Sequence, residues 1–210
     1  MTQVDVFDRH VLRYEQWFER HGAAFRSELE AIRELLSTRG PRLEVGVGTG
    51  RFAAPLGVSH GVDPSRTMLV RARARGIHVA QAVAEALPFP AGSFHTVLMV
   101  TTVCFLDDEA RAMGEMRRVL ASGGQAVLAF VDRDSALGLE YERRRPGNVF
   151  YRGARFVGAV EAGRLLEQAG FRDLRYVQTL RGDPDRMSRP EPALPGHGAG
   201  GFVVLAACTA

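Results

Sequence analysis

Two carboxylates and three glycines between residues 44 and 63 form the part of the sequence best suited to chemistry. Glu44 lies in an apolar stretch, Gly46, Gly48 and Gly50 follow it at alternate positions, and Asp63 closes the next apolar stretch. A strand that turns through glycines into a helix exposes bare backbone, because glycine has no Cβ and accepts unusual φ/ψ values. The turn also directs the free N–H groups of the helix N-terminus at a ligand.

Spacing distinguishes three ligands that use such loops. A nucleoside triphosphate loop requires G-x-x-x-x-G-K-[ST], and this chain contains no lysine. A dinucleotide fingerprint can be placed on Gly48, Gly50 and Ala53, but its acidic residue is expected about 20 positions later, and Asp63 comes too early. A third pattern, E/D-x-G-x-G-x-G with an acid ending the next strand, accounts for both carboxylates and all three glycines. It resembles the signature of class I S-adenosylmethionine (SAM)-dependent methyltransferases.

The resemblance implies an enzyme that uses SAM as its cofactor. In this family the acid and the loop backbone bind the amino and carboxylate groups of the methionine half, a role that falls here to Glu44 and the three glycines. Asp63 would accept from the two ribose hydroxyls with its two oxygens. The expected cofactor site also includes Pro64 and Met68. Met68 lies where family members pack the adenine ring, although it can equally be an ordinary core methionine.

Residues 82–89 resemble the family's G-D-A-E-x-L-P-F stretch, with one departure. The Asp that usually accepts from the adenine amino group is Val83 here, so adenine recognition would depend on the backbone of Ala84 and the side chain of Glu85. Thr101 is expected to contact the cofactor through its backbone or hydroxyl. Cys104 follows close to the expected methyl group, although a small buried hydrophobe is the simpler interpretation.

Residues 14–18 resemble a Y-D-x-W-[FY] segment of several small-molecule methyltransferases, in which the tyrosine closes over the cofactor. Aromatic faces attract a cation such as a sulfonium by about 0.5–2 kcal/mol, so Tyr14 joins the expected cofactor site; a core-facing aromatic stripe is the alternative. The catalytic group stays unknown. His10, His21 and His197 lie on segments expected to cover the site and are candidates for a base, as is Tyr14, but each histidine can equally be a surface residue.

Hydrophobic periodicity predicts an α/β fold. Two amphipathic helices come first, with apolar stripes from Phe7 to Phe18 and from Phe25 to Leu36. Strands and helices then alternate, which indicates a mostly parallel sheet covered on both faces, with Ser65 and Asp107 as helix N-caps. The expected strands are 43–47, 59–63, 77–81, 95–101, 125–131, 171–180 and 202–208, and the later helices are 51–56, 65–75, 108–121 and 157–169.

The last two expected strands have no helix between them, so they must pair antiparallel or lie apart. This agrees with the topology that the family resemblance implies: a Rossmann-like three-layer αβα sandwich with a seven-stranded sheet, its last strand antiparallel, and an N-terminal helical lid. We expect one methyltransferase domain over 1–210, with a helical cap at 1–39 and a cofactor-binding core at 40–131. Residues 132–210 would supply a substrate-side insertion and the C-terminal strands.

The composition limits the kinds of binding partner that we expect for this protein. Of the 210 residues, 46% are hydrophobic and 24% charged, as in ordinary globular proteins, and the formal net charge is only +3. The two cysteines form no metal pattern, and the chain shows neither a signal peptide nor an apolar run that could span a bilayer, so no metal, no membrane and a cytoplasmic location are expected. The modest lid favours a small-molecule acceptor. A nucleic-acid or protein acceptor, a nicotinamide oxidoreductase and a non-catalytic SAM-binding sensor are the alternatives.

Overall fold

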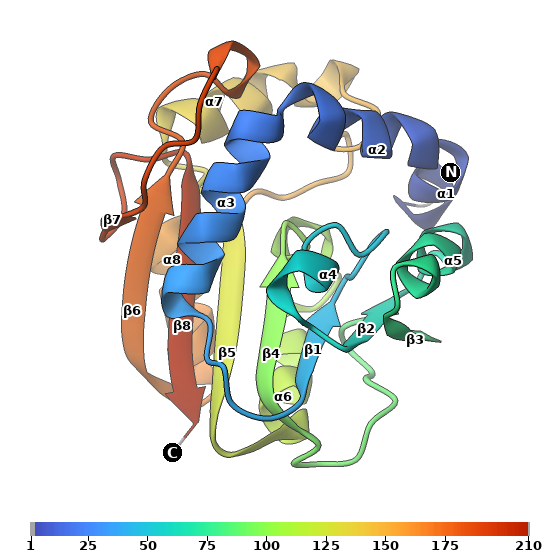
Figure 1. Cartoon of the computed structure of the whole chain (residues 1–210). Coiled ribbons are helices and arrows are strands. Elements are labelled where there is room, and N and C mark those ends of the chain that lie inside the picture. The colour runs from blue at the N-terminus through green and yellow to red at the C-terminus, as the bar shows by residue number, and fades with distance from the viewer. Residues whose placement is uncertain (1–2, 210) are drawn as a thin grey trace.

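The computed structural model describes residues 3–209, which build one eight-stranded sheet with helices on both faces (Figure 1). The strand order is β3-β2-β1-β4-β5-β8-β6-β7. Neighbouring strands among β1 to β5 pair in parallel, so their carboxyl ends share one edge. The strands are β1 (Arg42–Val45), β2 (His60–Asp63), β3 (His78–Gln81), β4 (Phe94–Val100), β5 (Leu120–Val131), β6 (Phe171–Thr179), β7 (Leu194–Pro195) and β8 (Phe202–Thr209).

The C-terminal strands confirm the predicted antiparallel pairing, while the predicted count of seven strands is one too low. β8 lies between β5 and β6 and runs antiparallel to both. The additional strand, β7, is a two-residue segment that pairs with Val177 and Gln178 at the outer edge of β6. A segment this short, in a link rich in Pro and Gly, shows no alternation of apolar and polar residues that could predict it.

Two apolar layers fill the space between the sheet and its helices. Successive residues of β4 point to opposite faces: Val97 and Met99 join the core under α6 and α8, whereas Leu98 and Val100 join the core under α3, α4 and α5. This double-sided burial explains why the central strands are apolar at nearly every position. The helices of the two layers are α3 (Gly22–Leu35), α4 (Ala53–Leu56), α5 (Arg66–Ala74), α6 (Glu109–Val119) and α8 (Ala159–Gln168).

The N-terminal segment forms three helices where two were predicted. The first apolar stripe is divided between α1 (Gln3–Arg9) and α2 (Val11–Arg20) because the backbone leaves helical geometry at His10, with φ −115° and ψ 22°. These two helices lie across the edge where the parallel strands end, whereas α3 runs down the sheet and packs on β6 and β8 (Figure 1). The helical lid over the sheet edge is therefore made by α1 and α2.

Two local predictions need correction. The N-cap of α6 is Asp108, whose Oδ1 accepts from the N–H of Arg111 at 2.9 Å, and not Asp107. The segment after β5 contains a helix that periodicity did not predict, α7 (Ala136–Arg144), with Ser135 as its N-cap. Ser65 caps α5 as predicted, because its hydroxyl accepts from the Met68 N–H at 3.1 Å.

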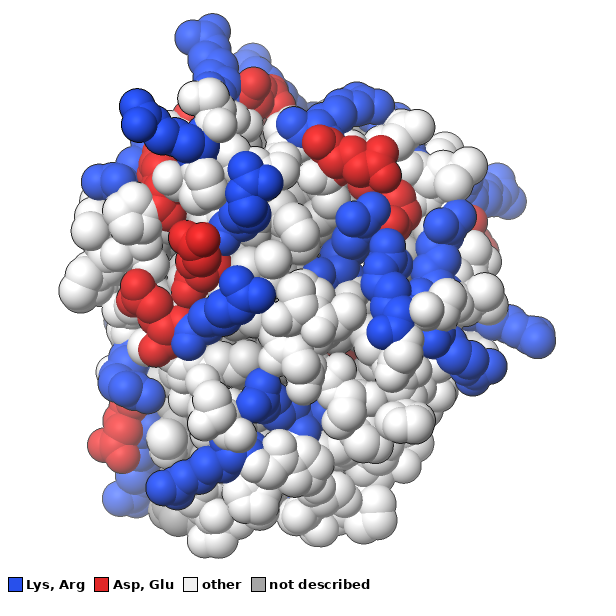
Figure 2. All heavy atoms as spheres, in the orientation of Figure 1, with Lys and Arg blue, Asp and Glu red and all other residues white. Residues whose placement is uncertain are grey.

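Arginines and carboxylates are interspersed over the upper half of the face shown in Figure 2, and the lower part of that face is mostly neutral. Several arginines lie close together on the right side of this view, below a strip of carboxylates. Within residues 3–209, no helix has both the length and the apolar character that a membrane span requires.

Candidate cofactor and acceptor site

The glycine loop after β1 adopts backbone conformations that suit glycine. Gly46, Gly48 and Gly50 have φ values of 74°, 52° and 81°, a region that side-chain-bearing residues rarely adopt. A Cβ added to Gly46 would lie 2.2 Å from the Thr102 hydroxyl, and one on Gly48 would lie 3.2 Å from the Tyr14 hydroxyl. The turn therefore brings bare backbone against the segment after β4 and against the lid helix α2.

Glu44 presents an unsatisfied carboxylate oxygen beside this loop. The residue lies on β1, is 1% exposed, and has no hydrogen-bond partner for Oε2 among the described residues. Burial, followed by repulsion from Asp63, raises the pKa of Glu44 well above its usual value, although the backbone N–H of Ala53 opposes this. A buried acceptor without a donor is destabilising, so the site suits a ligand that brings an N–H group, as the amino group of SAM does.

Asp63, at the end of β2, holds the loop in place. Its Oδ2 accepts from the Gly48 N–H at 2.9 Å and its Oδ1 from the Ser65 N–H at 2.8 Å. Burial raises the pKa of Asp63 to about 6, against the opposing effect of these two hydrogen bonds. Each carboxylate oxygen can accept more than one hydrogen bond, so Asp63 keeps capacity for the ribose hydroxyls.

The lid is fastened to the loop by Glu15, which the sequence analysis did not single out. Its carboxylate accepts from the Thr49 hydroxyl, from Arg51 Nη2 at 2.6 Å and from Arg75 Nη2 at 2.7 Å. Burial raises the pKa of Glu15, but the hydrogen bonds from Arg51, Thr49 and Arg75 outweigh it and hold the pKa below its usual value. A second link joins α1 to the next turn, because Asp8 Oδ1 accepts from the Ser65 hydroxyl at 2.5 Å.

Tyr14 is brought over the loop by these links. Its ring packs edge-on against Phe18, with 5.1 Å between ring centroids, and its hydroxyl faces Gly48. Burial and then the charge of Glu44 raise the pKa of Tyr14, so the phenol stays neutral. The Tyr14 hydroxyl therefore lies beside the glycine loop, and its ring is also part of an aromatic cluster.

The remaining predicted cofactor residues surround the same strand ends. Met68 is 1% exposed, Ala84 is buried, and Thr101 has a positive φ of 49° directly after β4. Glu85 Oε1 accepts from the backbone N–H groups of Asp107 and Asp108 at 3.0 and 3.3 Å, so Glu85 already ties together two loops. Pro64 is half-buried at the start of α5, and Val83 is 47% exposed.

The histidine candidates are not gathered at the glycine loop. His10 lies at the bend between α1 and α2, with its ring 6.3 Å from that of Phe150. His21 pairs with Asp185, with Nε2 2.7 Å from Oδ1. His197 is exposed and packs on Tyr176, at the outer edge of the sheet and far from β1 in strand order.

An aromatic wall stands over the ends of β4 and β5. The Tyr151 ring lies 5.5 Å from that of Tyr141, 5.3 Å from that of Phe156 and 6.1 Å from that of Phe105. Cys104 belongs to the same cluster. Burial raises the pKa of the Cys104 thiol to about 12, and because the thiolate is the nucleophilic form, this cysteine is suited to packing.

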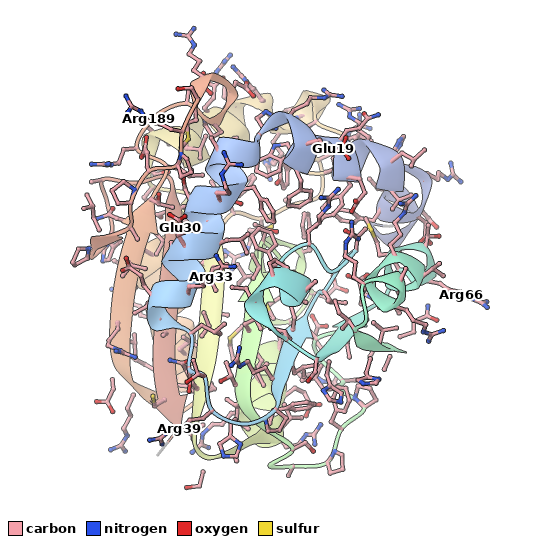
Figure 3. All side chains as sticks on the ribbon, viewed as in Figure 1. Glu19, Glu30, Arg33, Arg39, Arg66 and Arg189 are labelled. Atoms are coloured by element: carbon pink, nitrogen blue, oxygen red, sulfur yellow. The ribbon has the colours of Figure 1, made fainter. Side chains whose placement is uncertain are left out.

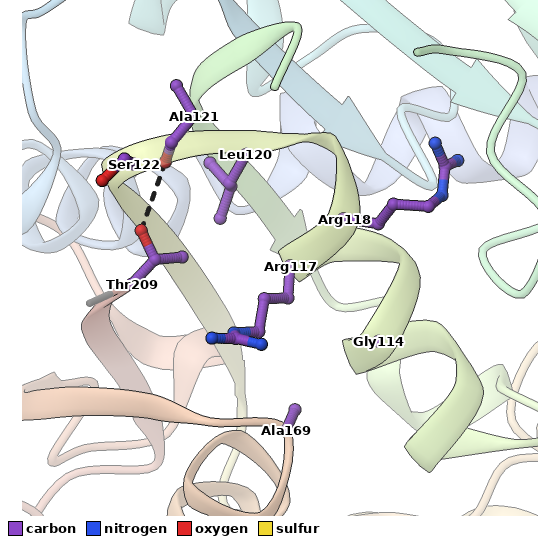
Figure 4. Close-up of a pocket in the computed structure, with 8 residues that line it drawn as sticks. All are labelled: Gly114, Arg117, Arg118, Leu120, Ala121, Ser122, Ala169 and Thr209. Atoms are coloured by element: carbon purple, nitrogen blue, oxygen red, sulfur yellow. Dashed lines mark hydrogen bonds between the residues drawn. The ribbon is translucent and has the colours of Figure 1, made fainter. Parts of the chain in front are cut away.

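A hollow of about 350 Å³ lies at the beginning of β5 and thus at the opposite end of this strand from the site (Figure 4). The Thr209 hydroxyl donates to the Ala121 carbonyl oxygen there, at 3.2 Å. None of the predicted cofactor residues lines this hollow, and we assign it no part in cofactor binding. Its lining residues are Gly114, Arg117, Arg118, Leu120, Ala121, Ser122, Ala169 and Thr209.

Comparison with known proteins identifies the family. The family described as a methyltransferase domain matches residues 43–128, which extend from β1 into β5. A crystal structure from Thermotoga maritima, described as a SAM-dependent methyltransferase and possible histamine N-methyltransferase, is 45% identical, with a TM-score of 0.96 over 98% of this chain and 99% of that one.

Curated relatives match over similar or shorter ranges. An uncharacterized protein of Methanocaldococcus jannaschii is 37% identical over 97% of this chain and 98% of its own length. The phosphatidylethanolamine N-methyltransferase of Cereibacter sphaeroides is 33% identical over 60% of this chain and 68% of that protein. The Rossmann-like sheet and these matches show that the chain belongs to the class I SAM-dependent methyltransferases, and S-adenosylmethionine is its cofactor.

Proposed function

We propose that this methyltransferase acts on a small-molecule acceptor and binds SAM at the glycine loop. The observation on which the proposal rests is the unpartnered, buried Oε2 of Glu44 beside that loop. When bound, SAM supplies an electrophilic methyl group on a sulfonium. The protein must then hold the acceptor's nucleophilic atom in line with that methyl group, in a space from which water is excluded.

In this proposal each end of the cofactor has its own partners. Glu44 accepts from the amino group, and the backbone of the glycine loop binds the carboxylate. Asp63 accepts from the ribose hydroxyls, and Tyr14 covers the bound molecule. Because Val83 replaces the family's Asp, the adenine amino group has no carboxylate acceptor at that position. Pro64, Met68, Ala84, Glu85 and Thr101 complete the proposed pocket.

The cover over the sheet edge supports a small acceptor. It is made by α1, α2 and residues 132–155, all of which are short segments, and its inner surface is the aromatic wall around Tyr151. Such a cover encloses a small molecule more readily than a folded protein or nucleic acid. Two relatives carry names that refer to small or lipid acceptors, histamine and phosphatidylethanolamine.

Calorimetric titration with SAM and S-adenosylhomocysteine tests cofactor binding, and Glu44→Gln and Asp63→Asn should both weaken it. Mass spectrometry of reactions with a panel of small acceptors then tests the activity. The proposal predicts a product that is heavier by one methyl group. Failure to bind at millimolar SAM would contradict it, as would methylation confined to protein or nucleic-acid acceptors. Binding without any product across the panel would favour the sensor.

A further inference from the structure

Gln81 is the last residue of β3, and its side chain lies at the sheet edge where the proposed SAM site is built. It pairs in register with Asp63 at the end of the neighbouring parallel strand β2. Its Nε2 donates to the backbone carbonyl oxygen of Pro64 at 2.9 Å, and the backbone N–H of Ala82 donates to that of Asp63 at 3.3 Å. These contacts bring the amide of Gln81 directly beside two residues of the proposed pocket.

Three adjacent strand ends follow the order of the chemical groups along a SAM molecule. The proposed function assigns the amino group to Glu44 on β1 and the ribose hydroxyls to Asp63 at the end of β2. The next strand outward is β3, which ends at Gln81 (Figure 1). Because neighbouring strands lie about 4.8 Å apart, a molecule that extends from Glu44 past Asp63 brings its adenine ring to the end of β3.

The Gln81 side chain lies on the face of the sheet that α5 covers. Successive residues of a strand point to opposite faces, and Gln81 therefore shares its face with Val79, which packs with the core under α3, α4 and α5. Ala80 and Ala82 pack on the opposite side, with the core under α6 and α8. Met68, which belongs to the proposed pocket, is also on α5. Gln81 is exposed, so its amide is accessible to a ligand bound there.

The side chains that follow Gln81 are less suited to binding the adenine amino group. Val83 is apolar, and Glu85 Oε1 already accepts from the backbone N–H groups of Asp107 and Asp108. The carboxamide of Gln81 has an acceptor oxygen beside an NH₂ donor, and adenine has an amino donor beside a ring nitrogen that accepts. The two groups are therefore complementary.

The contact with Pro64 fixes which way the amide faces. A carbonyl oxygen can only accept, so Gln81 must present Nε2 to it, and Oε1 is the atom left for an incoming donor. A flipped amide would bring Oε1 against the Pro64 carbonyl oxygen, which is unfavourable. The site therefore favours a ligand with an amino donor over one with an oxo group at the same position.

We propose that Gln81 recognises the adenine ring of SAM, with Oε1 accepting from the 6-amino group. Nε2 carries two hydrogens, so it can donate to the neighbouring ring nitrogen of adenine while it holds Pro64. This inference rests on the proposed function and identifies the residue that selects adenine at that same site. Hypoxanthine has an oxo group in place of the amino group, and it would bring an acceptor against Oε1.

Calorimetric titration with S-adenosylhomocysteine and with S-inosylhomocysteine, its 6-oxo counterpart, tests this selection. We expect the wild type to bind S-adenosylhomocysteine about 30-fold more tightly, as for one well-placed pair of an amide with adenine. Gln81→Met keeps the length of the side chain but loses the hydrogen bonds of the amide. This variant should bind the two ligands within about threefold of each other, because only the adenine ligand loses a favourable contact.

Gln168→Met, at an exposed position at the end of α8, is the matched control and should keep the wild-type preference. Equal affinity of the wild type for the two ligands would overturn the inference. A Gln81→Met variant that keeps the wild-type preference would also overturn it, even if both ligands bind more weakly, because Gln81 would then only hold Pro64 in place. Failure of the wild type to bind S-adenosylhomocysteine at all would contradict the proposed function instead.

Discussion

Replacing Glu15 by Gln should loosen the lid and weaken SAM binding. In the wild type, the Glu15 carboxylate joins α2 to Thr49 and Arg51 on the glycine loop and to Arg75 at the end of α5. Glutamine keeps an oxygen that can accept from Thr49 but removes the charge that the two arginines share. Because α2 carries Tyr14 over Gly48, a loosened α2 should open the cover of the cofactor.

The exposure of the three side chains sets the expected size of the effect. Removing one partner of a fully buried ion pair costs about 3–5 kcal/mol, whereas an exposed pair contributes less than about 1 kcal/mol. The Glu15 side chain is 11% exposed, and those of Arg51 and Arg75 are 23% and 28% exposed. An intermediate loss of about 2 kcal/mol corresponds to a roughly 30-fold higher Kd for SAM.

Calorimetric titration of SAM measures this difference, and thermal unfolding monitored by circular dichroism shows whether the variant remains folded. Glu19 provides the matched control (Figure 3): it lies on the same helix, its side chain is 69% exposed, and it approaches Arg51 only to 3.7 Å. Glu19→Gln should leave the Kd within about twofold of the wild type. A folded Glu15→Gln variant with wild-type affinity for SAM would refute the coupling between the lid and the loop.

Three further predictions follow from the same geometry. Burial raises the folded-state pKa of Glu28 to about 8, so its contribution to stability is full below pH 4.5 and is lost as pH rises through 8. The free energy of unfolding in urea, measured for the wild type relative to Glu28→Gln, should therefore fall by roughly 4 kcal/mol over this range. Parallel pH profiles of the two proteins would contradict this prediction. Burial raises the pKa of Asp63 to about 6, so SAM affinity should rise roughly tenfold from pH 5 to 7, and the rise should vanish in Asp63→Asn. Gly48→Ala should weaken SAM binding by about tenfold or more through backbone strain and contact with Tyr14. Gly76 is the control, because it also has a positive φ of 84° but a Cβ added there meets no atom within 4 Å. Gly76→Ala should therefore lower only the thermal stability.

Features set by local sequence were predictable. The loop from Glu44 to Gly50 and the position of Asp63 followed from residue types and spacing, because alternate glycines between a strand and a helix have few structural uses. The order of strands and helices also followed from periodicity, and the structure confirms the antiparallel C-terminal pairing. The glycines have a packing reason as well, since Gly46 contacts Thr102, a pairing distant in sequence that spacing alone does not indicate.

Features set by tertiary contacts were missed. Glu15 and Glu28 occupy buried positions of amphipathic helices, four residues after Val11 and Ala24 respectively, where a carboxylate is out of place. A carboxylate at such a position could have indicated a special role for each residue. The partners of Glu15 lie far along the chain, however, so the sequence pattern did not identify them. Asp107 lost its predicted capping role to Asp108 because the two carboxylates are adjacent and only the backbone angles decide between them.

The central claim is that the unpartnered oxygen of Glu44 binds the amino group of SAM, and a thermodynamic cycle tests it most directly. The cycle compares S-adenosylhomocysteine with 5′-methylthioadenosine, which lacks the amino-acid portion, on the wild type and on Glu44→Gln. We predict that Glu44→Gln weakens S-adenosylhomocysteine by roughly 10- to 100-fold and leaves 5′-methylthioadenosine nearly unaffected. Equal weakening of both ligands, or of neither, would contradict the assignment of Glu44.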